Sequence, residues 1–203
     1  MDITLALVLL FVAWIMLRVS YQRAHIAALG RNLSGLQLER YMETLTQGYA
    51  RAIHEDTEAR QNMVLENFAQ TERAAASQMQ ALASAMGKES AQAASMGNLA
   101  FCVPYIERVL PFAARDFRQL LQIHASGLRR VVDNEEGWDL KTRAYHLSAE
   151  LYLFQHSCHW FCKSRGVADA RLVLRHQVSH QKVLESVSDA TRAAYLQWQK
   201  GTH

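Results

Sequence analysis

The sequence predicts an all-α protein in three parts: a single N-terminal transmembrane helix, a long helical stalk with coiled-coil character, and a C-terminal antiparallel helical bundle. Three observations predict this class. The chain begins with an uncharged apolar run, its middle repeats apolar residues at heptad spacing, and its last hundred residues repeat them at spacings of three and four. Only two prolines and nine glycines among 203 residues also favour helix.

The membrane anchor is predicted in residues 1–21. Residues 3–17 carry no charge, and extending the run to Tyr21 gives 19 residues. That length makes about 28 Å of helix, close to the roughly 30 Å of bilayer hydrocarbon. We predict a retained span in the lipid bilayer rather than a cleaved signal peptide, because no basic segment precedes the run. The expected anchor side chains are Leu5, Leu9, Phe11, Trp14, Arg18 and Tyr21, the last in the aromatic belt.

The charges beside the span predict its orientation. No Lys or Arg precedes it, whereas Arg18, Arg23 and Arg31 follow it. The positive-inside tendency therefore places the N-terminus outside and the C-terminal region in the cytoplasm. An odd number of cysteines argues against a disulfide framework and agrees with a reducing compartment; the three are Cys102, Cys158 and Cys162.

Residues 22–98 are predicted to form the stalk. Their apolar positions alternate steps of three and four, with an interruption at Asp56 and a change of register after Met63. We expect weak self-association through this face, made effective by membrane tethering. The expected oligomerisation seam consists of Leu38, Met42, Leu45, Tyr49, Phe68, Met79, Leu82 and Met86. The alternative is that the segment folds back on the bundle as an extra helix.

Residues 99–203 are predicted to form a three-helix bundle, or a four-helix bundle together with the stalk. The expected helices cover about 104–132, 139–164 and 168–199, with turns around Gly137 and Gly166. Short connections make neighbouring helices antiparallel.

The segment 156–162, HSCHWFC, is the main candidate for chemistry. On a helix, Cys158 and Cys162 share the core-facing stripe, His159 lies at its edge, and His156 points elsewhere. Folding the next helix back about Gly166 brings one further histidine near. The candidate zinc set is Cys158, Cys162, His159 and His176. Packing of the two cysteines in the core is the favoured alternative, and no other cofactor is expected.

Two further histidines lie in the middle of apolar stripes. His124 and His180 are expected to be core residues with hydrogen-bond partners, and a pH- or ligand-responsive bundle is the alternative. His176 and His180 have the H-x3-H spacing of a metal pair, but Gln177 replaces the glutamate that a zinc protease needs.

The predicted function is that of a membrane-anchored scaffold that self-associates or recruits an unidentified protein partner at the cytoplasmic face. No phosphate-binding glycine loop, nucleophile elbow or di-iron pair occurs, so no enzymatic activity is expected. A net charge of +3 gives no reason to expect a nucleic-acid partner. One alternative is a metal-, redox- or pH-responsive membrane-bound sensor that uses Cys158, Cys162 and the core histidines. A weaker alternative is a membrane-disrupting effector.

Overall fold

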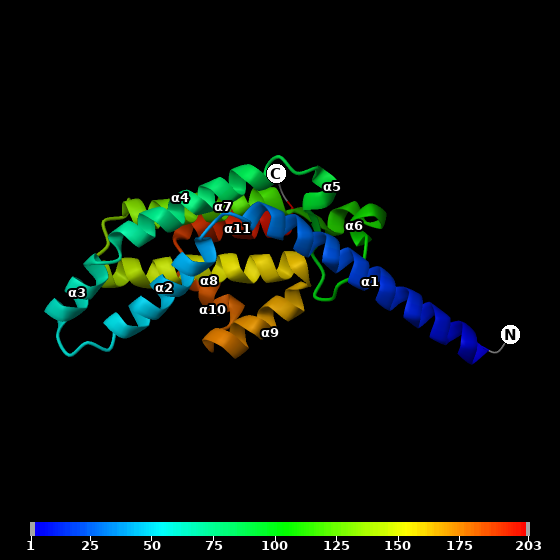
Figure 1. Ribbon diagram of the computed structural model, residues 1–203, viewed down its shortest axis with the longest axis horizontal. Coiled ribbons are helices and arrows are strands. Elements are labelled where there is room, and N and C mark those ends of the chain that lie inside the picture. The colour runs from blue at the N-terminus through cyan, green and yellow to red at the C-terminus, as the bar shows by residue number, and fades with distance from the viewer. Residues whose placement is uncertain (1–2, 202–203) are drawn as a thin grey trace.

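A computed structural model describes residues 3–201, and it confirms a mostly helical protein (Figure 1). The first half of one helix projects from a helical body formed by the other described residues (Figure 1). The elements in chain order are α1 (Ile3–Leu33), α2 (Leu38–Ala52), α3 (Glu58–Glu66), α4 (Ala69–Met86), α5 (Ala91–Ala94), β1 (Ser95–Gly97), α6 (Ile106–Val109), the 3-10 helix η1 (Pro111–Ala113), β2 (Ala114–Asp116), α7 (Phe117–Asp133), α8 (Leu140–Cys162), α9 (Arg165–His176), α10 (His180–Ser186) and α11 (Asp189–Lys200).

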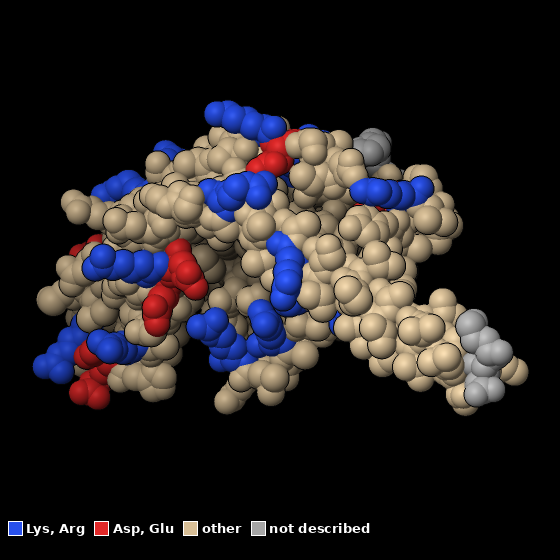
Figure 2. All heavy atoms as spheres, turned by 45° about the vertical axis from the view of Figure 1, so that its right-hand side comes forward, with Lys and Arg blue, Asp and Glu red and all other residues tan. Residues whose placement is uncertain are grey.

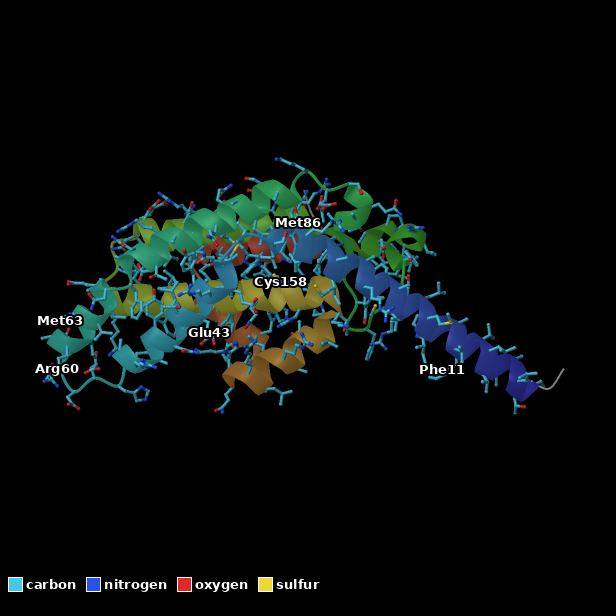
Figure 3. All side chains as sticks on the ribbon, in the orientation of Figure 1. Phe11, Glu43, Arg60, Met63, Met86 and Cys158 are labelled. Carbon is cyan, nitrogen blue, oxygen red and sulfur yellow. The ribbon has the colours of Figure 1, made fainter. Side chains whose placement is uncertain are left out.

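Helix α1 consists of a projecting half and a packed half. None of the residues 3–20 is buried, and Phe11 lies on the part that projects from the body, while burial begins at Tyr21 (Figure 3). The projecting part is about 27 Å long at the rise of an α-helix. Within residues 3–201, α1 alone is long and apolar enough to cross a membrane. Tyr21 is buried where α1 meets the body, and its hydroxyl donates to Glu107 Oε2 at 3.3 Å.

The body is built around three helices that run along its long axis. Helices α4, α7 and α8 lie side by side there, and α11 packs against α7 (Figure 1). Helix α2 covers α4 and α8, while α9 and α10 pack on α8. Strands β1 and β2 add a short antiparallel pair with Met96 opposite Arg115. This pair was not anticipated from the sequence.

Residues 22–98, which the sequence predicts to form a stalk, do not form one extended helix. Residues 22–98 are divided among several helices, because Gly35 takes a left-handed φ of 88° after α1 and Thr57 caps α3. Most of the expected oligomerisation seam is buried within the single chain: Leu38, Leu45, Tyr49, Met79, Leu82 and Met86. The partly buried Met42 and Phe68 pack against the same core. An apolar helix face can be covered by other helices of the same chain or by a partner. Here helices of the same chain cover the face that carries the seam residues.

A buried polar group fastens the folded-back helices to the rest. Glu72 of α4 accepts a hydrogen bond from Tyr49 of α2 at 2.6 Å and pairs with Arg143 of α8 at 2.8 Å. The Glu72 side chain is 3% exposed and that of Arg143 is 15% exposed. A charge this deep requires its partner, so α2, α4 and α8 are held in one arrangement.

Two of the three predicted C-terminal helices have different bounds. The first begins at Phe117 instead of near residue 104, because Pro111 lies in η1 and Asp116 caps α7. The last is divided into α9, α10 and α11. Gln177 ends α9 with a left-handed φ of 53°, and serines at the next two N-caps start new helices.

Candidate metal centre

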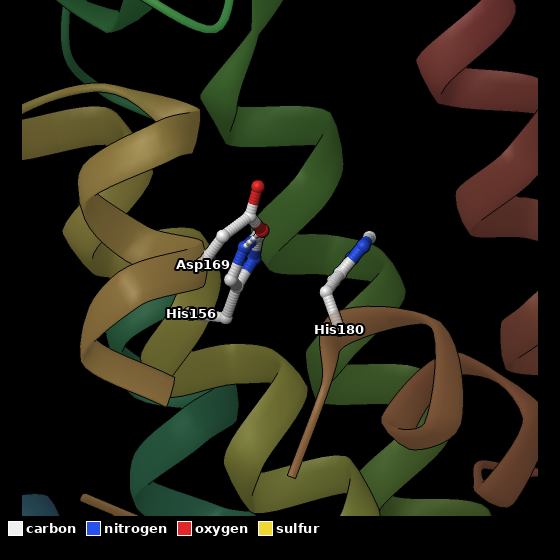
Figure 4. Close-up of side chains that lie close together, drawn as sticks. All are labelled: His156, Asp169 and His180. Atoms are coloured by element: carbon white, nitrogen blue, oxygen red, sulfur yellow. Dashed lines mark hydrogen bonds and ion pairs between the residues drawn. The ribbon is translucent and has the colours of Figure 1, made fainter. Parts of the chain in front are cut away.

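The structure brings together two histidines and one aspartate from three different helices. His156 lies on α8, Asp169 on α9 and His180 at the start of α10 (Figure 4). One ligand atom from each residue lies within 4.8 Å of the other two. Within the part of the chain that the structure describes, this is the one group of three or more such side chains with that proximity.

Local sequence explains how the three side chains converge. Ser164 caps α9, with its side chain accepting from Val167 N, so that α9 reverses direction directly after α8. Gln177 then ends α9, and Ser179 caps α10 by accepting from Lys182 N. As a result His180 occupies the first turn of α10, opposite the face of α8 that carries His156.

The geometry combines direct bonding with ring stacking. His156 Nε2 lies 2.8 Å from Asp169 Oδ1. The His156 and His180 rings are stacked, with centroids 4.3 Å apart and planes 20° apart. The side chain of His156 is fully buried, whereas that of Asp169 is 45% exposed. The cluster therefore combines a buried imidazole, that of His156, with a carboxylate that solvent can reach, that of Asp169.

The charge states of His180 and Asp169 suit metal binding at neutral pH. Burial, followed by the proximity of His156, lowers the pKa of His180 to about 4, so its imidazole is neutral. The hydrogen bond from His156 lowers the pKa of Asp169, which is therefore ionised. Neutral imidazole and carboxylate are the forms that bind metal ions. In addition, His156 Nδ1 is buried with no hydrogen-bond partner among the described residues.

Behind the cluster a chain of hydrogen bonds leads into the core. His180 Nε2 lies 3.1 Å from the Tyr195 hydroxyl, which is hydrogen-bonded to Ser157. Ser157 Oγ lies 2.9 Å from His124 Nε2. His124 is 1% exposed, and burial lowers its pKa to about 3, so it stays neutral. Outer partners of this kind fix the orientation of ligand imidazoles.

The zinc set expected from the sequence does not assemble. His176 Nε2 instead lies 2.7 Å from Gln155 Oε1, and His159 Nδ1 accepts from Arg171 at 2.9 Å. Burial raises the pKa of the Cys158 thiol well above its usual value and that of Cys162 to about 11. Both thiols are therefore protonated at neutral pH, so they are poor nucleophiles, and a metal ion would have to displace their protons to bind there.

Sequence reasoning missed two of the three clustered residues as ligands. His156 was set aside because it points away from the cysteine face, and it does point away, toward α9. Nothing in the spacing of the sequence points to Asp169 as a ligand. The error lay in the position of the turn. The sequence predicts a turn around Gly166. In the structure His156 and Asp169 are neighbours, so the chain reverses about residues 162–163, which lie midway between them.

Comparison of the chain with known protein families, with curated proteins and with solved structures found no match. The fold and the site therefore define the class by themselves: a mostly helical protein with one N-terminal candidate membrane helix and a two-histidine, one-carboxylate cluster in its helical body.

Proposed function

We propose that this protein is a membrane-anchored helical sensor that binds one divalent transition-metal ion through His156, Asp169 and His180. The observation that carries the proposal is the mutual proximity of their three ligand atoms, within 4.8 Å, from three helices. The proposal keeps the metal-responsive alternative from the sequence but replaces its ligands.

The ligand chemistry favours a borderline first-row ion such as Zn²⁺, Fe²⁺ or Co²⁺. Imidazole nitrogens suit these ions, and one carboxylate adds an oxygen ligand and a negative charge. Three protein ligands leave at least one coordination position for water. The half-exposed Asp169 side chain gives the ion a path from solvent to the buried His156.

Metal binding would act on α9 and α10. The two helices are joined through the three residues 177–179, and each packs mainly on α8. An ion held by one residue from each of these three helices would join them directly. Because a ligand that binds only the assembled site stabilises that state, occupancy would order α9 and α10 against α8.

The membrane would supply location. Helix α1 would hold the body at a bilayer, and the arginines after the span would place the body in the cytoplasm. Scaffolding by stalk pairing receives less support, because the seam side chains are buried inside the chain. Recruitment of a protein partner would need another surface.

Metal titration of the full-length protein in detergent tests the proposal. After removal of metal with a chelator, we expect Zn²⁺ or Co²⁺ to bind at one ion per chain by calorimetry and elemental analysis. Asp169→Asn and His180→Asn should each weaken binding by at least about tenfold, since losing even an outer partner of a ligand costs that much.

Matched control variants distinguish this site from the zinc set that the sequence predicts, which contains Cys158 and Cys162. His176→Asn and the double substitution Cys158→Ser/Cys162→Ser alter neighbouring residues that lie outside the cluster, and both should bind normally. Circular dichroism would verify that each variant is folded. Absence of binding by the wild type, or loss of binding only in these controls, would refute the proposal.

A further inference from the structure

One segment of the body exposes an unusual number of large apolar side chains. Within residues 99–112, which we name the foot, exposed fractions reach 82% for Phe101, 76% for Phe112 and 74% for Val109. The exposed members are Leu99, Phe101, Val109, Leu110 and Phe112. Exposed apolar residues elsewhere in the body are mostly isolated, which is ordinary, whereas a group within one short segment indicates an interaction surface.

The foot is attached to α1 where that helix leaves the body. The Tyr21 hydroxyl donates to Glu107 Oε2 at 3.3 Å, and the Tyr21 ring meets Tyr105 edge-on with centroids 5.2 Å apart. The Arg18 side chain is hydrogen-bonded to Cys102. Figure 1 shows α6, which belongs to the foot, beside α1 at the edge from which α1 projects. The foot therefore lies level with residues 18–22 of α1.

If α1 spans the membrane, the foot lies at the surface of the bilayer. The projecting residues 3–20 make about 27 Å of helix, nearly the thickness of the hydrocarbon core. Residues 18–22 then fall at the boundary between hydrocarbon and headgroups, and the foot falls there with them. Phenylalanine, leucine and valine side chains that enter this boundary exchange water for acyl chains, which is favourable.

The charges near the foot are mostly positive. Arg18 and Arg108 are exposed, and Arg108 lies over the Tyr105 ring at 4.5 Å. Lys163 donates to Gln22 Oε1 at 3.2 Å, and so lies beside the packed half of α1. The acidic Glu107 is occupied by Tyr21. Figure 2 shows a mostly uncharged surface where the body meets the projecting helix. Cations around an apolar surface favour anionic lipid headgroups.

From this placement we infer that the foot is a second membrane contact, which inserts Phe101, Val109 and Phe112 into the headgroup boundary of the bilayer that α1 crosses. The body would then lie against the membrane in one orientation instead of swinging on a single helix. The inference requires α1 to span the bilayer, but it does not require the metal centre.

Photo-crosslinking tests the inference in the full-length protein. Benzoylphenylalanine would replace Phe101 or Phe112, and the protein would be reconstituted in vesicles of phosphatidylcholine and phosphatidylglycerol. Phe11, on the projecting half of α1, is the positive control. Met63 is the negative control, because it is 65% exposed but lies at the far end of the body (Figure 3). Mass spectrometry would detect lipid adducts.

We expect lipid adducts at positions 11, 101 and 112 and at most a background level at position 63. Adducts at position 11 with only background at 101 and 112 would overturn the foot while leaving the anchor intact. Background adducts at all four positions would overturn both the foot and the membrane span. Either failure is distinct from failure of metal binding, which is measured in detergent without vesicles.

Discussion

At the scale of single residues, Glu150 is a buried acid with a strongly raised pKa. Its side chain lies in the core at 2% exposure, and its Oε1 accepts from both the backbone nitrogen and the hydroxyl of Ser188 at 3.3 Å. Burial raises the pKa of Glu150 to about 7, an effect that the hydrogen bonds only partly offset. Near neutral pH this carboxyl is thus divided between its neutral and ionised forms.

The raised pKa of Glu150 predicts a specific pH dependence of stability. Between about pH 4.5 and 7 the folded state keeps the proton that the unfolded state has lost, so the free energy of unfolding falls as pH rises. The fall approaches about 1.4 kcal/mol per pH unit for one group. Chemical unfolding at several pH values, with Glu150→Gln as reference, measures it. The free energy of unfolding of the wild type, relative to that of the variant, should fall as pH rises from about 4.5 to 7, because the variant has no carboxyl to ionise; a difference that does not change with pH would count against the raised pKa.

Gly127 tests the packing around the same carboxyl. A Cβ at this position would lie 2.8 Å from Glu150 Oε2 and would overlap Thr191 Oγ1. We therefore expect Gly127→Ala to destabilise the protein by about 1–3 kcal/mol through overpacking. Gly30 is the matched control, since it also lies in a helix but has no atom within 4 Å of the added Cβ. Gly30→Ala should be neutral or slightly stabilising. Equal thermal shifts for both variants would disagree with the described packing.

At the scale of elements, helix type was predictable from the sequence but helix partners were not. Spacing predicts that Leu45 and Met79 lie on apolar helix faces, because it determines which side chains share a face, and both are buried. Spacing does not state whether the covering surface belongs to the same chain. Likewise, α9, α10 and α11 look like one helix by periodicity, since a left-handed glutamine such as Gln177 leaves no strong sequence signal.

The Glu72 group tests whether the folded-back helices contribute to stability. Glu72→Ala would leave the mostly buried Arg143 without its partner, so we expect a loss of about 3–5 kcal/mol in unfolding free energy. Tyr49→Phe removes one hydrogen bond but keeps the ion pair, and should cost about 1–2 kcal/mol. Glu66→Ala, at an exposed end of α3, is the control and should change little. If Glu72→Ala matched this control, the ion pair of Glu72 with Arg143 would not hold α4 to α8.

Metal binding predicts a local change in dynamics. We expect Zn²⁺ to slow amide hydrogen exchange in α9 and α10, because the ion would join both helices to α8. Helices α2 and α3 hold none of the three ligands, so their exchange should stay the same. Exchange measured by mass spectrometry on the full-length protein, with and without Zn²⁺, makes this comparison. Protection spread evenly over the chain, or absent, would contradict a site between these helices.

At the scale of the whole molecule, two features lie in separate parts of one chain. The projecting half of α1 and the foot form one end of the molecule, where contact with a bilayer is proposed. The cluster of His156, Asp169 and His180 lies in the body, where α9 and α10 cover α8. The sequence predicted the long apolar helix at this end, because an apolar helix is a local property, but it gave no indication of the foot. It missed the cluster, because that depends on the register of two turns.

The identity of the atoms around a bound ion tests the central claim most directly. X-ray absorption spectroscopy of the full-length protein loaded with one equivalent of Zn²⁺ would measure them. The account predicts only nitrogen and oxygen ligands, at about 2.0–2.1 Å from the metal. A sulfur ligand at about 2.3 Å would instead place the ion at Cys158 or Cys162 and would contradict the proposed site.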